Sequence, residues 1–280
     1  MGHPMSVNLN QAGFRVKVHD LVESKMDALV PLGIVKTASH AEAIEDADFI
    51  LTMLPSGLEV QSVYDEHILE HARSDALLID SSTIDTGESK AIHQKASGRG
   101  YAVLDAPVSG GTIGAKNGAL TFMVGGEADT LERARPVFDA MGKSVIHCGP
   151  GGMGQAAKMC NNMMLAIQMA SVAEGFRLAE KCGLSHEKLF EVATQSSANC
   201  FALTTFCPVP DIVPTAPSSA GYQPGFSAEL MLKDLTLALN TAAREGLDLG
   251  SAKAAEPRYQ SLVDQGRAQI DFSAIYTDIE

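Results

Sequence analysis

Two kinds of hydrophobic pattern alternate along the first half of the chain. Longer stretches with helical spacing, such as Leu58–Ala72 and Ala128–Met141, separate short runs that are rich in apolar residues. The strand-like runs are Phe14–His19, Phe49–Leu54, Ala76–Asp80, Ala102–Asp105, Leu120–Val124 and Val145–Cys148. Strands that alternate with helices predict a mainly parallel sheet with helices on both faces.

The pattern changes after the glycine-rich segment Gly149–Gly154, and from there on it predicts helices only. We therefore expect an α/β fold with a doubly wound parallel sheet in residues 1–150 and an all-α second domain in residues 151–280. The stretch Cys207–Pro224 interrupts the helical half. Because its prolines are spaced and interleaved with apolar residues, we expect an ordered loop there.

Between Lys143 and Glu174 the only fully charged side chain is Lys158. The long apolar run around it, opened by glycines, predicts a helix that is buried nearly all round, in which a lysine needs a specific partner. Burial lowers the pKa of a lysine toward the range in which it exchanges protons at neutral pH. Asn162 lies one helical turn further on the same face. The alternative is a lysine stem on apolar surface with its ammonium in water.

Composition excludes several classes of partner. The 280 residues carry a formal net charge of −13 and no basic cluster, which argues against nucleic acid or an anionic membrane surface. Five cysteines without close pairs and eight scattered histidines indicate neither a disulfide framework nor a metal site. There is no apolar run of membrane-spanning length and no targeting signature at the start, so we expect a cytoplasmic enzyme.

Four segments resemble the β-hydroxyacid dehydrogenases. They are LLIDSSTID at 77–85, DAPVSGG at 105–111, LTFMVGG at 120–126 and GQAAKMCNN at 154–162. Residues 208–211, 220–226 and 231–235 resemble the 3-hydroxyisobutyrate dehydrogenase branch in particular. The resemblance implies a Rossmann-type NAD-binding domain, followed by an all-α substrate domain. Because the helical half is so apolar, we expect it to bury surface between the subunits of a homodimer or homotetramer.

The family's dinucleotide fingerprint is a strand followed by a loop with three glycines. By resemblance, the chain starts inside this loop with Gly2 as the third glycine, and the strand and two glycines before it are absent. We therefore expect this chain to bind NAD poorly and the natural protein to begin about ten residues earlier, so that the fingerprint is complete. A mitochondrial targeting segment would be lost with such a start.

Asp20 follows a strand-like run, where the resemblance implies hydrogen bonds to the ribose hydroxyls of the adenosine. A carboxylate there repels a 2′-phosphate, and the next residues, Leu21 and Val22, offer no arginine for that phosphate. We therefore expect NAD rather than NADP as the cofactor. By its residue type alone, an acidic residue after a strand is usually a turn former.

The segment Leu54 and Pro55 follows another strand-like run, at the end of the sheet where open α/β folds bind ligands. The resemblance implies that its backbone passes along the adenosine ribose and the pyrophosphate. Glu59 stands where the family has an asparagine, and we interpret it as a solvated helical glutamate.

Three further residues are assigned to the cofactor by resemblance. Thr83 matches a threonine beside the nicotinamide ribose, although a serine or threonine after a strand also commonly caps the next helix. Lys233, on an expected helix Ala228–Arg244, matches a lysine that closes over the cofactor side, with Asp234 near it. The alternative is an exposed pair of neighbouring charges.

The substrate needs donors for a small carboxylate. Ser109, Gly110 and Gly111 follow a strand, and glycines let backbone N–H groups approach an anion, although a plain tight turn would use the same residues. The resemblance implies that this turn holds the carboxylate, Lys158 acts as general base and Asn162 fixes the geometry of the hydroxyl and the lysine. No metal is required.

The function that the resemblance implies is NAD-dependent oxidation of 3-hydroxyisobutyrate to methylmalonate semialdehyde in valine catabolism, a branched-chain amino acid pathway. An alternative is a dehydrogenase or semialdehyde reductase for another short β- or γ-hydroxy acid. Phosphorylated sugar acids are disfavoured because there is no arginine cluster for a phosphate. A non-enzyme alternative is a catalytically impaired paralogue that acts as an interaction module, which the missing strand favours and the intact Lys158, Asn162 and Ser109 disfavour.

Overall fold

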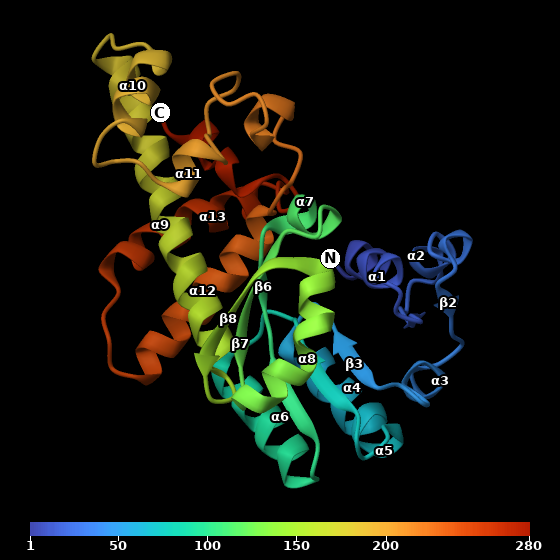
Figure 1. Ribbon diagram of the computed structural model, residues 1–280. Coiled ribbons are helices and arrows are strands. Elements are labelled where there is room, and N and C mark those ends of the chain that lie inside the picture. The colour runs from blue at the N-terminus through green and yellow to red at the C-terminus, as the bar shows by residue number, and fades with distance from the viewer. The chain divides into compact units, whose positions relative to one another are not determined.

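The computed structural model describes residues 1–280 (Figure 1). The chain forms two compact units, Met1–Lys158 and Met159–Glu280. The long helix α9, Met153–Lys181, continues through this division. The predicted boundary near residue 150 lies just before this helix, in the glycine-rich turn that opens it.

The first unit contains two sheets. Strands β1 (Lys17–Val18) and β2 (Val35–Lys36) form a small parallel pair. The second sheet has six strands in the order β3-β4-β5-β7-β6, with β8 paired to β7. Its strands are β3 (Phe49–Thr52), β4 (Leu77–Asp80), β5 (Ala102–Asp105), β6 (Val108–Ser109), β7 (Leu120–Gly125) and β8 (Gly142–Gly149).

Parallel pairing dominates the larger sheet. The pairs β3 with β4, β4 with β5, and β7 with β8 are parallel, whereas β7 runs antiparallel to β5 and β6. Strand β1 bonds only to β2, and β3 bonds only to β4, so no ladder joins the two sheets. Lys17 in β1 is instead tied to the helix before β3, because its Nζ donates to the carbonyls of Glu42 and Glu45 at 3.1 and 2.6 Å.

Helices cover both faces of the larger sheet. The helices that precede α9 are α1 (Gly2–Gln11), α2 (Glu23–Asp27), η1 (Val30–Leu32), α3 (His40–Ile44), α4 (Gly57–Val63), η2 (Tyr64–Ile68), α5 (Leu69–His71), α6 (Thr86–Gly98), α7 (Gly111–Lys116) and α8 (Ala128–Met141). Leu77 and Ile79 of β4 pack in one core cluster with residues of α1 and α8, and Leu78 packs in a second cluster with residues of α4 and α6. Burial on both faces explains the continuous apolar run of this strand. The predicted α/β fold is confirmed.

The predicted helix Leu58–Ala72 is interrupted. The segment is helical from Gly57 to His71, but η2 is a π-helical turn between α4 and α5. Tyr64, the first residue of this turn, is fully buried in the core. A π-turn places one extra residue in a helix, a change that hydrophobic spacing alone does not reveal.

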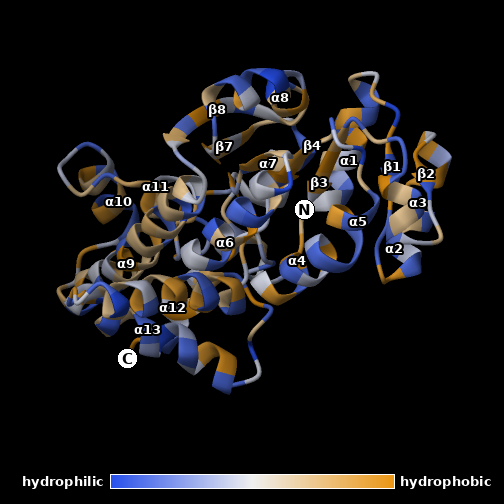
Figure 2. Cartoon of the chain, turned by 90° about the horizontal axis from the view of Figure 1, so that it is seen from below, coloured by the Kyte–Doolittle hydropathy of each residue, from blue (hydrophilic) through white to orange (hydrophobic).

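The second unit is helical, as predicted. After α9 it contains α10 (His186–Thr194), α11 (Phe201–Thr204), η3 (Pro217–Ala220), α12 (Ala228–Arg244), α13 (Gly250–Asp264) and η4 (Phe272–Asp278). Phe176, Tyr259 and Phe272 are fully buried in its core cluster, and the Tyr259 hydroxyl donates to the Ala166 carbonyl at 2.8 Å. Figure 2 shows hydrophobic and hydrophilic residues mixed along α12, as expected for a helix with one buried face. No helix of the chain combines the length and apolar character needed to cross a membrane.

The segment Cys207–Pro224 holds only the short helix η3, and side chains tie its loops down. Ser218 Oγ donates to the Cys207 carbonyl at 2.6 Å, and the Tyr222 hydroxyl donates to the Pro208 carbonyl at 2.7 Å. These bonds span the segment, so that its two halves are fixed against each other.

The prediction that the lysine-bearing helix is buried nearly all round is wrong. The buried face of α9 carries residues at helical spacing, namely Lys158, Asn162, Ala166, Met169, Ala173 and Phe176. The exposed residues of α9 are Cys160, Met164, Ser171, Glu174 and Leu178, with Glu180 and Lys181 at its end. Composition suggested full burial because this outer face is largely apolar too. A helix buries only the faces on which other elements pack, whatever the residues on the rest of it.

Candidate functional site

The carboxyl ends of β3 and β4 bring together three of the residues assigned to the cofactor, Gly2, Leu54 and Thr83. The Leu54 N–H donates to Ser82 Oγ at 2.9 Å, which joins the segment after β3 to the segment that carries Thr83. A Cβ built on Gly2 would lie 3.9 Å from the Cβ of Met53, so the start of α1 lies beside the same strand end. This is the edge at which open α/β sheets bind their ligands.

The start of α1 suits an anion. Gly2 is its first residue, and no side chain caps this end of the ten-residue helix. The first N–H groups of a helix have no partner within it, and together with the helix dipole they favour a phosphate. These features fit the pyrophosphate of a dinucleotide.

Asp20 lies just after β1 and forms a turn. Its Oδ1 accepts a hydrogen bond from the Val22 N–H at 2.8 Å, and its Oδ2 lies 3.7 Å from Lys25 Nζ. The side chain is 39% exposed, so the carboxylate is accessible while it forms the turn. The turn-forming role that residue type suggested is present, and a contact to ribose stays a prediction.

Two alternatives at nearby positions can be decided. Helix α6 is capped by Asp85, in a capping box with Glu88, so Thr83 is not the cap and that alternative is wrong. Glu59 is exposed in the first turn of α4 and accepts a hydrogen bond from Ser56 Oγ, which lowers the pKa of Glu59. It is the solvated helical glutamate that we expected.

The turn after β6 requires its glycines. Ser109 pairs with Thr121 of β7, and the next two residues have positive φ angles of 130° at Gly110 and 62° at Gly111. A Cβ on Gly110 would also approach Leu120 Cδ2 to 3.3 Å. Other residues adopt such angles only with strain, so the role as a plain tight turn is fulfilled here. Helix α7 begins at Gly111 without a side-chain cap.

Two buried carboxyl groups that sequence reasoning did not single out lie under the same edge. Asp80 and Asp105 are register partners at the ends of β4 and β5, each 3% exposed. Burial raises the pKa of Asp80, and hydrogen bonds from Ser82 and Thr52 oppose this rise. Burial also raises the pKa of Asp105, opposed by the N–H groups of Gly152 and Gln155.

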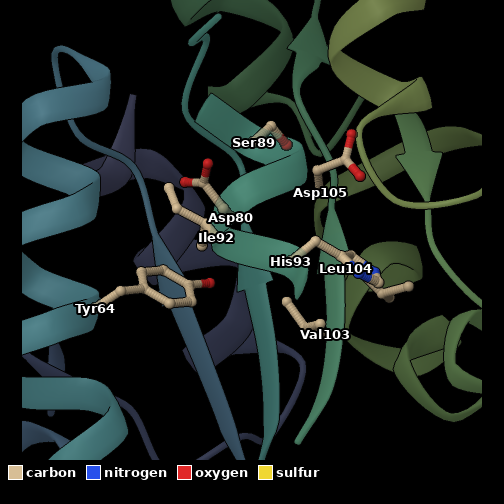
Figure 3. Close-up of a pocket in the computed structure, with 8 residues that line it drawn as sticks. All are labelled: Tyr64, Asp80, Ser89, Ile92, His93, Val103, Leu104 and Asp105. Atoms are coloured by element: carbon tan, nitrogen blue, oxygen red, sulfur yellow. The ribbon is translucent and has the colours of Figure 1, made fainter. Parts of the chain in front are cut away.

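Asp80 and Asp105 line an interior cavity of about 10 Å³ (Figure 3). Tyr64 from η2 and His93 from α6 also line it. The Tyr64 hydroxyl, Asp80 Oδ2 and His93 Nε2 have no hydrogen-bond partner among the atoms of the protein. A cavity of this volume is near the smallest that admits one water molecule. It is too small for a substrate.

Asp105 fixes the start of α9. Its Oδ1 accepts from the Gly152 N–H at 2.6 Å and its Oδ2 from the Gln155 N–H at 2.9 Å. The carboxylate thereby bonds two N–H groups at the amino end of this helix, the arrangement that caps a helix and matches its dipole. Lys158 follows in the same first turns and is 8% exposed, which disfavours an ammonium in bulk water.

Asn162 and Asp234 form a buried pair in the second unit. Asn162 is 2% exposed, and its Nδ2 donates to Asp234 Oδ2 at 2.6 Å. Its Oδ1 accepts from Asn161 Nδ2 at 3.0 Å, so both ends of the Asn162 amide are assigned. Lys233 Nζ lies 3.5 Å from the other oxygen of Asp234. Because Asp234 is 3% exposed, the alternative of an exposed charge pair is wrong for this residue.

The candidate residues divide between the two units. The first unit holds Gly2, Asp20, Leu54, Pro55, Thr83, Ser109, Gly110, Gly111 and Lys158, and the second holds Asn162, Lys233 and Asp234. Lys158 and Asn162 nevertheless lie one turn apart on the continuous helix α9. No group of histidine, cysteine, aspartate and glutamate side chains is arranged to hold a metal ion.

Comparison with known proteins identifies both halves of the chain. Residues 1–149 match the model of the NAD binding domain of 6-phosphogluconate dehydrogenase, and residues 152–279 match that of the NAD-binding domain of NADP-dependent 3-hydroxyisobutyrate dehydrogenase. A probable 3-hydroxyisobutyrate dehydrogenase of Mycobacterium tuberculosis is 45% identical over 98% of this chain and 93% of its own length. An NAD-dependent L-serine dehydrogenase of Pseudomonas aeruginosa is 43% identical over the same shares.

A solved structure of the Mycobacterium tuberculosis 3-hydroxyisobutyrate dehydrogenase with L-serine superposes with a TM-score of 0.95 at 45% identity, covering 99% of this chain and 95% of that one. Fold and comparisons together define an NAD-dependent oxidoreductase of hydroxy acids. Within that class, the chain belongs to the 3-hydroxyisobutyrate dehydrogenase family.

The packing at the start of α9 makes a prediction about Gly154. A Cβ at this position would lie 2.2 Å from the Met123 carbonyl oxygen and 2.9 Å from that of Asp105, and backbone atoms cannot yield cheaply. We expect Gly154→Ala to lower the free energy of unfolding by about 1–3 kcal/mol, the usual cost of overpacking. The matched control is Gly175→Ala on the same helix, where a Cβ meets nothing within 4 Å. It should raise stability by about 0.5–1 kcal/mol. Urea unfolding followed by circular dichroism measures both, and equal effects would contradict the packing argument.

Proposed function

We propose that this enzyme oxidises 3-hydroxyisobutyrate to methylmalonate semialdehyde with NAD, a step of valine catabolism, and that Lys158 is the general base. The observation that carries the proposal is the polar cluster on an otherwise apolar helix. Lys158 is buried, and Asn162 follows one turn later with its amide orientation set by Asp234. Several relatives at 38–45% identity are named 3-hydroxyisobutyrate dehydrogenase.

We assign removal of the substrate's hydroxyl proton to Lys158, with Asn162 fixing the geometry. The unprotonated amine of Lys158 removes the proton of the substrate hydroxyl as the carbon that bears it is oxidised. Asn162 Nδ2 donates one N–H to Asp234, and Asn162 Oδ1 accepts from Asn161. An amide nitrogen carries a second N–H, which can donate to the oxygen of the substrate hydroxyl and leave the hydroxyl proton directed to the amine of Lys158.

The carboxylate of the substrate needs a separate anchor. The Ser109 hydroxyl and the N–H groups of Gly110 and Gly111 provide donors at the uncapped start of α7. A fixed carboxylate limits the substrate to few orientations, and such positioning accounts for a large part of the rate in enzymes of this kind.

The first turn of α1, beginning at Gly2, would hold the pyrophosphate of the cofactor, and the carboxylate of Asp20 the adenosine ribose. Leu54, Pro55 and Thr83 would line the cofactor along the strand ends. Lys233 and Asp234 are also assigned to the cofactor. Bound NAD supplies the acceptor for the hydride. A homo-oligomer and a cytoplasmic location stay predictions.

L-serine is the second candidate substrate. It shares the β-hydroxyl and the carboxylate with 3-hydroxyisobutyrate, and the two differ at carbon 2, which carries an ammonium in serine and a methyl group in hydroxyisobutyrate. The relative named NAD-dependent L-serine dehydrogenase is 43% identical to this chain. This identity is close to the 45% of the relative named probable 3-hydroxyisobutyrate dehydrogenase. Acceptance of serine therefore depends on side chains that meet this one group.

The first prediction from this proposal concerns the substrate. We expect kcat/KM for 3-hydroxyisobutyrate to exceed that for L-serine by at least about tenfold, because an ammonium that loses water without a carboxylate partner costs more than a methyl group. Initial rates of NADH formation with both acids, and with 4-hydroxybutyrate, measure the preference. A higher kcat/KM for L-serine would replace the proposed substrate but keep the reaction.

The second prediction concerns Lys158. Lys158→Ala should lower kcat by roughly 10²–10⁴-fold, the usual contribution of a positioned acid–base group, with little change in the affinity for NAD. Lys143→Ala, at an exposed lysine of β8, is the matched control and should leave kcat within about twofold, because surface substitutions act weakly. Steady-state kinetics and NADH fluorescence titration measure the two quantities. Activity of Lys158→Ala within a few-fold of the parent would exclude the lysine as the base.

The third prediction concerns the cofactor. The Asp20 carboxylate should make NAD the preferred nucleotide, and the double variant Asp20→Ser with Leu21→Arg should shift the preference toward NADP. The change removes a negative charge and supplies a guanidinium for the 2′-phosphate. Leu21 is 88% exposed, so the arginine has room. The ratio of kcat/KM for NAD and NADP is the measurement, and a parent enzyme that prefers NADP would show that Asp20 does not face the ribose.

A further inference from the structure

Gln155 is a buried polar residue of α9 that none of the assigned roles uses. It is 1% exposed and lies three residues before Lys158. Its Nε2 donates to the Ser82 carbonyl at 2.7 Å, and its Oε1 accepts from the Ile84 N–H at 3.2 Å. The two ends of one amide therefore bind the backbone on either side of Thr83.

The residue that makes these two bonds is itself held. The Gln155 N–H donates to Asp105 Oδ2 at 2.9 Å, which sets the first turn of α9 against the end of β5. Gly154 lies so close to the backbone of Met123 and Asp105 that even a Cβ would not fit there. The side chain of Gln155 thus joins the first turn of α9, which Asp105 holds, to the loop that carries Thr83.

The loop around Thr83 is also tied to β3. Ser82 Oγ accepts from the Leu54 N–H at 2.9 Å, and the Ser82 N–H donates to Asp80 Oδ1 at 3.1 Å. Side-chain hydrogen bonds consequently link the ends of β3 and β4 to the helix that carries Lys158. All of these groups belong to the first unit.

We propose that Gln155 is a positioning residue that sets the distance between the cofactor loop at Thr83 and the amine of Lys158. This inference rests on the proposed function, because it assumes that Lys158 is the base and that Thr83 lines the cofactor. Hydride leaves the substrate carbon that bears the hydroxyl, and the proton leaves the oxygen of the same hydroxyl. The cofactor and the base must therefore be held at a fixed distance from each other. A misplacement of about 1 Å between such groups can cost 10²-fold in rate.

The test uses two variants of nearly the same size in the full chain. Gln155→Met removes both hydrogen bonds and should lower kcat by roughly 10–100-fold, with a rise in KM for NAD, because the Thr83 loop is released. Gln155→Glu keeps an acceptor for the Ile84 N–H but places a negative charge one turn from Lys158. A nearby opposite charge favours the ammonium, so the acidic limb of the plot of kcat/KM against pH should move up by about one unit.

The matched controls are Gln168→Met and Gln168→Glu, at a partly buried residue of α9 that lies thirteen residues after Gln155 and ten after Lys158. About 15 Å of helix separates this position from Lys158, since each residue rises 1.5 Å. Neither control should shift the acidic limb of the plot of kcat/KM against pH, and neither should change kcat or KM for NAD. A purely structural role of Gln155 would lower thermal stability in its variants but leave their kcat and KM for NAD unchanged, which would overturn the proposal.

The remaining outcomes are also decisive. If Lys158→Ala is nearly inactive while the Gln155 variants behave like the Gln168 variants, only the positioning role is wrong. If Lys158→Ala keeps its activity and the parent's pH limb, the proposed base is wrong and the limb belongs to another group. If Gln155→Met does not fold, Gln155→Glu decides. Failure of both to fold would show that the amide holds the fold rather than the geometry of turnover, and would equally overturn the proposal.

Discussion

The structure of the first unit depends on a constraint at the carboxyl ends of β3, β4 and β5. Strands that end inside the protein leave polar groups that must find partners away from water, and each group without one costs about 1–3 kcal/mol. Asp105 satisfies part of this need by bonding the N–H groups of Gly152 and Gln155. The same bonds fix where α9 begins, and therefore where Lys158 lies. The stability of this edge and the placement of Lys158 are in this way consequences of one carboxylate.

In the second unit, buried polar groups are paired by neutral and charged side chains together. Asn162 and Asp234 are both buried, and each supplies what the other lacks, an N–H donor and a carboxylate acceptor. A lone buried carboxylate would be costly, and Lys233 at 3.5 Å reduces that cost further. The orientation of the Asn162 amide is thus determined before any substrate arrives. Preorganised dipoles of this kind do not need to reorient during the reaction.

The extent of sequence-based prediction differed between elements for physical reasons. β5, α8 and α12 have the predicted bounds, because their hydrophobic spacing is regular and the ends carry caps or turns. The π-turn at Tyr64 and the two-residue strands β2 and β6 were missed, since such short irregular elements follow from tertiary pairing rather than from local spacing. Lys158 and Asn162 could be singled out as polar residues in an apolar run. Gln155 stood in the same run, but its partners Ser82 and Ile84 lie about seventy residues away, and no local pattern connects them.

The positive φ angles at Gly110 and Gly111 bear on how such chains can be told apart. A glycine that the backbone conformation requires will be kept under selection for folding alone. This holds even in a gene copy whose protein no longer turns over a substrate. The Ser-Gly-Gly motif is therefore a poor marker of activity among paralogues.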